Sequence, residues 1–281
     1  MSVVVAVADT RRSSSGECLR ALRRQLRSDT EVIVVGDVDY DDLRSWAQVV
    51  PCADKPVPVL WSIGIAEARG GIVALLADTV IPDPNWLALT ERSHDDCVVG
   101  VGGPIEPGPR LHIVDWAVYF CRYASYGLPL PTAPVDVPAD NASYRADILR
   151  QYASSFTDGF WEPFVHRRLR QDGHAVVMRS ERIVRYSAGA SARAFRRQRF
   201  THGLEHGRLR SVGSPRVLVV AGIVSAPAVP VVMLARVYGV VWGRKRHRAR
   251  LLVATPTLAW FYGWWAAGEL CGRLRVVTRR T

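Results

Sequence analysis

The sequence predicts an α/β domain built on a mostly parallel sheet, followed by a helical tail of different composition. Short apolar runs typical of buried strands alternate with helical patterns over the first 190 residues. Single acidic residues directly follow some of these runs, as in the segment VALLAD that ends at Asp78. Beyond residue 216 the chain becomes both apolar and basic, which indicates a second structural part.

The expected elements follow from apolar periodicity and from the turn residues between them. Strands are expected at residues 3–8, 31–35, 72–76, 98–101, 175–178 and 182–186. Helices are expected at residues 18–26, 58–68, 86–92, 114–123, 143–151 and 160–171. Residues 9–16 are expected to form a polar loop, and the Pro-rich residues 127–140 an irregular connection.

The charge of the chain is concentrated in its last third. Residues 179–281 hold twenty Lys and Arg against three acids, whereas residues 1–178 hold seventeen against twenty-three. Such a tail suits a nucleic acid or an anionic membrane. Residues 217–235 carry no charge, and Glu269 is the only charge in residues 251–272, so both stretches could cross ~30 Å of hydrocarbon. We therefore expect an anionic membrane as partner and no nucleic acid.

Basic residues surround both apolar stretches. Six Lys and Arg lie between residues 236 and 250, and more precede and follow. Because a two-span hairpin would place this cluster on the far side of the membrane, the pattern favours segments that lie in the cytoplasmic leaflet. A two-span hairpin and a helical hairpin buried against the first domain remain alternatives.

The cysteines and the N-terminus indicate a cytoplasmic first domain. The five cysteines are scattered and form no C-x-x-C, which fits a reducing compartment and gives no zinc signal. The first apolar run, VVVAVA, lacks a basic leader and is too short for a signal peptide. We expect the protein at the cytoplasmic face of the plasma membrane.

Five segments in order resemble the family-2 inverting glycosyltransferases of the GT-A fold, of the membrane-associated bacterial type. They are VVVAVADTRR, EVIVVGD, LWSIGIAEARGGIVALLADTVIPDPNWL, DVPADNASYRADIL and FTDGFWEPFVHRRLRQDGH, which together cover residues 3–186. The resemblance implies a GT-A domain over residues 1–190. A basic linker or amphipathic segment (191–216) and hydrophobic membrane-associated helices (217–281) would follow it.

The resemblance also implies the reaction. A sugar would move, with inversion, from a nucleoside-diphosphate sugar to a lipid-linked or envelope glycan acceptor. The donor diphosphate needs compensating positive charge, usually Mg²⁺ or Mn²⁺ held by carboxylates. The family's Asp-x-Asp is Ala77-Asp78-Thr79 here, so Thr79 takes the usual metal-ligand place and Asp78 is the candidate donor or metal contact. Asp83 could substitute as a ligand, although an Asp between two prolines is also typical of a turn.

Other residues receive roles from the same resemblance. Asp9 and Asp37 follow two strands and would contact the donor nucleotide, unless they only form turns. Glu162, in the first turn of a helix, would be the general base that deprotonates the acceptor hydroxyl, with Asp158 in reserve. His166 lies one turn beyond Glu162, where it would either orient Glu162 or be a surface histidine.

The acceptor and the diphosphate have further candidates. Asn141 and Arg145 would face the acceptor, although Asn141 could instead be a helix N-cap. Arg196 and Arg199, in FRRQRFTHG, would contact a diphosphate or lipid headgroups. Ala77 and Thr79 also keep a second interpretation open, namely a catalytically degenerate GT-A relative that acts as a membrane partner subunit.

Overall fold

The computed structural model describes residues 1–8, 13–38, 42–94, 97–131 and 136–278. The chain forms two compact units. Unit 1 comprises Met1–Pro109 and Tyr126–Gly189, and unit 2 comprises Arg110–Ser125 and Ala190–Thr281. We describe each unit by itself.

The centre of unit 1 is a seven-stranded sheet with strand order β3-β2-β1-β4-β8-β6-β9. Its strands are β1 (Ser2–Val7), β2 (Glu31–Gly36), β3 (Gln48–Val50), β4 (Ile72–Ala77), β6 (Val98–Gly102), β8 (Asn141–Arg145) and β9 (Ala175–Met178). Only β8 runs antiparallel to its neighbours. The C-terminal ends of β1, β2, β4 and β6 therefore share one edge with the N-terminal end of β8, and this edge carries the candidate site.

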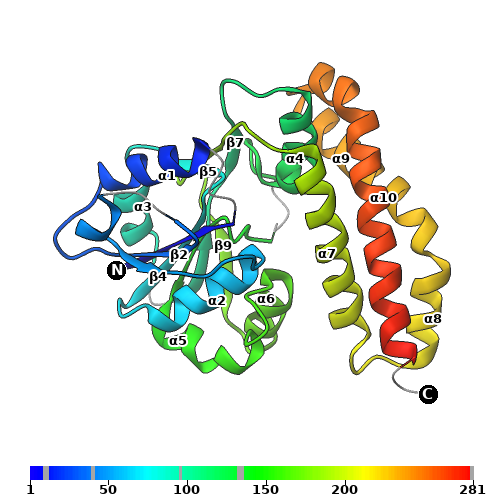
Figure 1. The fold of residues 1–281 in the computed structure, drawn as a ribbon, viewed down its shortest axis with the longest axis horizontal. Coiled ribbons are helices and arrows are strands. Elements are labelled where there is room, and N and C mark those ends of the chain that lie inside the picture. The colour runs from blue at the N-terminus through cyan, green and yellow to red at the C-terminus, as the bar shows by residue number, and fades with distance from the viewer. Residues whose placement is uncertain (9–12, 39–41, 95–96, 132–135, 279–281) are drawn as a thin grey trace. The chain divides into compact units, whose positions relative to one another are not determined.

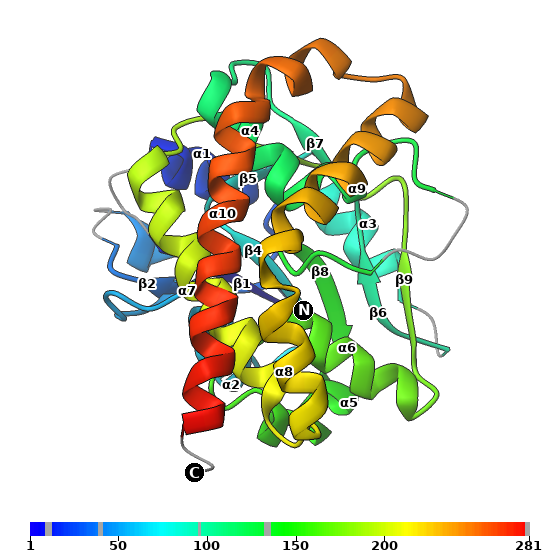
Figure 2. The same ribbon diagram turned by 90° about the vertical axis from the view of Figure 1, so that its right-hand side faces the viewer.

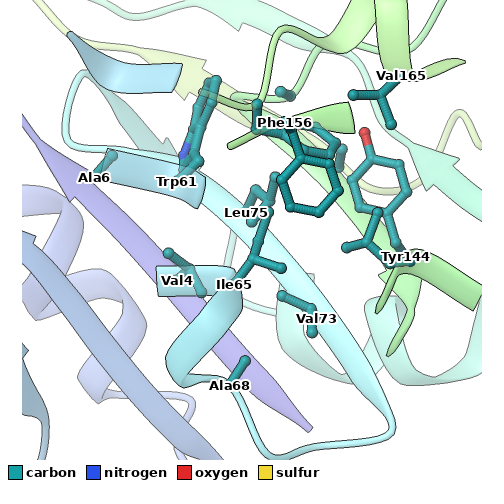
Figure 3. Close-up of a cluster of buried hydrophobic side chains, with 14 of the residues drawn as sticks. Val4, Ala6, Trp61, Ile65, Ala68, Val73, Leu75, Tyr144, Phe156 and Val165 are labelled. Atoms are coloured by element: carbon teal, nitrogen blue, oxygen red, sulfur yellow. The ribbon is translucent and has the colours of Figure 1, made fainter. Parts of the chain in front are cut away.

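Helices cover both faces of the sheet (Figure 1). Helices α1 (Ser13–Arg23) and α3 (Trp86–Arg92) lie on one face, and α2 (Val57–Glu67), α5 (Ala146–Gln151) and α6 (Glu162–Gln171) lie on the other. The second face is the apolar core, where Trp61 of α2 packs with Leu75 of β4, Tyr144 of β8 and Val165 of α6 (Figure 3). The buried strands consist largely of Val, Ile, Leu and Ala because both of their faces are covered.

Strand β8 differs from the sequence-based expectation. Residues 143–151 were expected to be one helix, but Asn141–Arg145 is a strand and the helix begins only at Ala146. The strand is wedged between β4 and β6, so pairing on both edges decides its conformation rather than its local pattern. Three further short strands, β5 (Val80–Pro82), β7 (Ile105–Pro107) and β10 (Val184–Tyr186), form a separate sheet. The loop expected over residues 9–16 ends earlier, because α1 begins at Ser13.

Unit 2 is helical. It contains α4 (Ile113–Tyr123), α7 (Ala192–Ser211), α8 (Arg216–Val224), α9 (Val229–Arg244) and α10 (Arg248–Thr278). Figure 2 shows α10 running alongside α7. Glycines permit a close approach of these two helices, because a Cβ on Gly203 or Gly207 would lie 2.2 or 2.3 Å from a backbone oxygen of α10. Gly268 and Gly272 of α10 meet backbone oxygens of α7 in the same way, each at 2.1 Å.

The two units divide the chain differently from the expected domains. The division after Gly189 lies close to the predicted end of the first domain at residue 190. However, Arg110–Ser125, which includes α4, belongs to unit 2, and residues 191–216 are mostly the long helix α7 rather than a linker. A buried Asp115 ties these segments of unit 2 together, since its carboxylate accepts from the backbone N–H of His112 and of Ala190 at 2.9 and 2.8 Å.

Candidate active site

Two predicted donor-binding acids lie at the shared sheet edge. Asp37 follows β2 directly and is exposed. Asp78 follows β4, is only 2% exposed, and donates its backbone N–H to the carbonyl of Ala6 at 3.0 Å. Asp9, the third predicted acid, lies outside the described residues.

Asp140 is a further acid at this edge, and sequence reasoning missed it. Leu76 of β4 pairs with Asn141 of β8. Asp140 lies in the turn directly before this pair, where Asn141 donates its backbone N–H to the carbonyl of Pro138 at 2.9 Å. Asp140 is 4% exposed. No motif marks this residue, so its place became visible only with the strand pairing.

Glu162 reaches the same edge through a tight turn. Gly159 has φ +122°, a backbone conformation that favours glycine, and the next residue, Phe160, donates its N–H to the carbonyl of Pro58 at 2.7 Å. Pro58 lies in the first turn of α2, which begins at the C-terminal edge of the sheet because it follows the parallel strand β3. Glu162 is half-buried at the first position of α6, whereas Asp158, the reserve base, is exposed.

His166 is a fully buried residue, so its interpretation as a surface histidine is wrong. Its Nε2 lies 2.7 Å from the hydroxyl of Tyr144, and its Nδ1 lies 2.6 Å from Oδ1 of Asp136. Both ring nitrogens are therefore engaged, and His166 contacts Tyr144 and Asp136 rather than orienting Glu162 by a direct bond. Burial alone would raise the pKa of Asp136, but hydrogen bonds and charge from His166 and Arg170 hold it below its ordinary value.

The acids converge electrostatically on Tyr126, another residue that the sequence did not indicate. Burial raises the pKa of Tyr126, and the negative charges of Glu162, Asp136 and Asp140 raise it further, in that order. One phenol therefore lies within electrostatic reach of three carboxylates, one from α6 and two from the connection before β8. Asp78, at the end of β4, completes the candidate site with Asp140 and Glu162 at one edge of the sheet.

The predicted acceptor residues do not face this site. Asn141 is fully buried: its amide donates to the carbonyls of Pro104 and Arg182 at 3.0 and 2.7 Å, and its Oδ1 accepts from Trp86 Nε1 at 2.7 Å. These bonds connect β8 to three other segments of unit 1. Asn141 is the first residue of a strand, so it is also not the N-cap of a helix. Arg145 pairs with Ile72 at the opposite end of β4 and binds Asp147 at 2.8 Å, which places it at the far edge of the sheet.

Arg196 and Arg199 belong to α7 in unit 2. Arg196 stacks over Trp264 and Trp260, at 4.8 and 5.7 Å from the ring centroids. Arg199 is 6% exposed and stacks on Phe195 at 4.6 Å, so of its two predicted partners, a diphosphate or lipid headgroups, the burial argues against the headgroups. Burial lowers the pKa of Arg199, an effect that the nearby thiol of Cys121 partly offsets.

The metal-binding capacity of the described residues is limited. They contain no group of three or more His, Cys, Asp or Glu that could hold an ion. Asp83 forms a two-pronged ion pair with Arg185 at 2.9 and 3.1 Å, so it does not substitute for the missing acid. The buried hydroxyl of Thr79 has no hydrogen-bond partner among these residues. Because Mg²⁺ often takes one or two carboxylates plus substrate phosphates, Asp78 and Thr79 fit an ion whose other ligands come from the donor and water.

Comparisons with known proteins support the fold. No family model matches the chain, and no curated protein sequence matches it. A solved mannosyltransferase, PcManGT from Pyrobaculum calidifontis in complex with GDP-Man and Mn²⁺, has a TM-score of 0.58 at 16% identity, covering 95% of this chain and 86% of the other. Residues 1–349 of S. aureus TarS give 0.49 at 13% identity, covering 98% and 91%. The likeness to the mannosyltransferase, together with the parallel-rich sheet of unit 1, confirms the predicted α/β fold of the GT-A type.

Proposed function

We propose that unit 1 is an inverting, hexosyl-type glycosyltransferase that takes its sugar from a nucleoside-diphosphate sugar. The observation that carries the proposal is the placement of Glu162 at the same sheet edge as Asp78, by way of the bond from Phe160 to Pro58. Ligands of open α/β sheets bind outside the carboxyl ends of the strands, so both acids face the region where a donor would lie.

Glu162 and Asp78 have different roles in the proposed reaction. Glu162 accepts the proton of an acceptor hydroxyl while the hydroxyl oxygen attacks the anomeric carbon. The bond from that carbon to the diphosphate breaks, the nucleoside diphosphate leaves, and attack from the opposite side inverts the configuration. A base in this position contributes about 10²–10⁴-fold to the rate. A divalent ion, held by Asp78 and Thr79, would offset charge on the leaving diphosphate.

Unit 2 supports a membrane location for this activity. All the exposed large hydrophobic side chains of the described residues lie in unit 2, with Val224 75%, Val217 71% and Val231 67% exposed. Unit 2 holds nineteen Lys and Arg against three acids, a net charge of +16. Each basic residue near an anionic leaflet contributes about 1 kcal/mol. We assign unit 2 to the cytoplasmic face of the plasma membrane and the acceptor to the lipid-linked or envelope glycans.

The helices favour binding within one leaflet. One helical segment among the described residues, Ala226–Arg244, is long and apolar enough to cross a membrane. Residues 251–272, which belong to α10, form no second such segment by length and composition, and Leu251, Leu258 and Phe261 of this helix are buried. A flotation assay tests the assignment: binding to vesicles should require anionic lipid and fall with salt. Equal binding to neutral vesicles, or binding to DNA or RNA instead, would contradict it.

The catalytic proposal is tested with a panel of nucleoside-diphosphate sugars, with and without Mn²⁺. Thermal shift identifies the donor, because a ligand of the folded state raises its stability. Transfer and donor hydrolysis are then measured for the wild type and for Glu162→Gln, which should lose about 10²–10⁴-fold in kcat. Asp147→Asn is the matched control, since Asp147 also lies in a first helical turn but at the opposite sheet edge. Activity measured for Asp158→Asn in the same assay shows whether Asp158, rather than Glu162, is the general base.

The alternative interpretation, a catalytically degenerate GT-A relative that acts as a membrane partner subunit, predicts a different result. A wild-type protein that binds a donor or a membrane protein but neither transfers nor hydrolyses sugar with any donor would favour that alternative. Equal activity of the wild type and Glu162→Gln would instead show that another group is the base.

A further inference from the structure

Four side chains of unit 1 form a continuous line of hydrogen bonds. The hydroxyl of Tyr144 lies 2.7 Å from His166 Nε2, His166 Nδ1 lies 2.6 Å from Asp136 Oδ1, and Arg170 Nη2 donates to the same oxygen at 2.9 Å. The backbone N–H of Val137 donates to that oxygen as well, at 2.9 Å. The proposed reaction uses none of these groups directly, although three of them are buried or half-buried.

This line fixes α6 against two other segments. His166 and Arg170 lie one and two turns after Glu162, Tyr144 belongs to the central strand β8, and Asp136 lies in the connection that leads to it. Figure 3 shows Tyr144 inside the apolar cluster with its hydroxyl directed toward Val165 of α6. The bonds therefore join the first turns of α6 to the most buried part of the sheet.

The partners of the line fix the ring of His166. Arg170 and His166 hold the pKa of Asp136 below its ordinary value, so this carboxylate is ionised and accepts the proton of His166 Nδ1. The other ring nitrogen, Nε2, is hydrogen-bonded to the Tyr144 hydroxyl at 2.7 Å. Both ring nitrogens are therefore engaged, which specifies a single ring orientation for His166.

Glu162 belongs to the same electrostatic environment. Burial raises the pKa of Tyr144, and the charges of Glu162 and Asp136 raise it further. The charges of Glu162 and Asp136 therefore both act on the Tyr144 phenol, and Glu162 lies one helical turn before His166 of the same line.

We propose that Tyr144, His166 and Asp136 are positioning residues for Glu162, which hold the first turn of α6 at the distance that proton transfer requires. The inference rests on the proposed function. A displacement of about 1 Å at a reacting group can cost 10²-fold in rate. Loss of one link should therefore lower kcat by about 10- to 100-fold, with a smaller effect on KM because the donor contacts remain.

The test compares four variants with the wild type. Tyr144→Phe removes one link and keeps the ring that packs against Phe160. Asp136→Ala removes Oδ1, which accepts all three bonds. The side chain of Arg170 is 43% exposed, so we expect Arg170→Gln to fold even if the variants at the more buried positions do not. Tyr152→Phe is the matched control, because Tyr152 donates to Asp172, at the other end of α6, at 2.6 Å.

Measurements of kcat, KM for the donor and the thermal midpoint separate the outcomes. We expect kcat to fall about tenfold or more in the first three variants, KM to change less than about threefold, and Tyr152→Phe to match the wild type. Unchanged kcat in folded Arg170→Gln and Asp136→Ala, with Glu162→Gln inactive, would overturn this inference and leave the proposed function intact. An inactive wild type would overturn the proposed function first, and the inference with it.

Discussion

The close contact between α7 and α10 gives the sharpest prediction about stability. A Cβ on Gly268 would lie 2.1 Å from the carbonyl oxygen of Phe200 and 2.9 Å from the nitrogen of Leu204. Carbon and carbonyl oxygen ordinarily approach to about 3.3 Å, so Gly268→Ala must push the helices apart by roughly 1 Å. Backbone atoms cannot rotate away as a flexible side chain would.

The cost follows from the packing that this shift removes. A gap of 0.5–1 Å forfeits roughly a quarter to a half of each dispersion contact along the interface. Overpacked positions typically cost about 1–3 kcal/mol, and replacing a helical glycine by alanine returns up to about 1 kcal/mol. Gly263 offers the matched control, because it lies in the same helix and a Cβ there would meet nothing within 4 Å.

We therefore expect Gly268→Ala to lower the free energy of unfolding by about 1–3 kcal/mol and Gly263→Ala to raise it by up to about 1 kcal/mol. Denaturant unfolding followed by circular dichroism measures both variants under the same conditions. Equal stability of the two proteins would refute the reasoning, because only the helix contact distinguishes the two sites.

Three further predictions concern single groups. Arg273→Met should destabilise unit 2 by about 3–5 kcal/mol in thermal unfolding, because it leaves Glu269, its buried partner at 2.6 Å, unpaired; adding Glu269→Gln should restore most of the loss. The folded pKa of Asp136 lies below the unfolded value of 3.8, so its contribution to stability is present above that pH and is lost as pH falls through the folded pKa; Asp136→Asn should therefore reduce the fall in urea midpoint below pH 3.8. A thiol reagent at pH 8 should modify exposed Cys97 readily and Cys18 only after unfolding, because burial raises the pKa of the Cys18 thiol.

Local patterns predicted most of the sheet. The runs that became β1, β2 and β4 are continuous apolar segments ended by polar residues, and such segments specify buried parallel strands without help from the rest of the chain. The acids at positions 37 and 78 could be placed for the same reason, since they directly follow strands. Residues 86–92 were predicted to be a helix, and α3 has these bounds.

Features that depend on long-range pairing could not be predicted. The segment NASYR has neither a helical nor an alternating pattern, and only its neighbours make it a strand. Asp136 and Asp140 lie in the connection that leads to this strand, so their positions could not be predicted either. The sequence left His166 either as a residue that orients Glu162 or as a surface histidine, because its partners lie 22 and 30 positions earlier in the chain.

A second acid lies near the altered acidic motif. Asp140 immediately precedes β8, whose first residue, Asn141, pairs with Leu76, two residues before Asp78. Both side chains are buried, with Asp78 2% and Asp140 4% exposed. Under the proposed function, an acid from a second segment therefore lies at the sheet edge where the Asp-x-Asp motif has lost one, and the pairing of β4 with β8 brings it there.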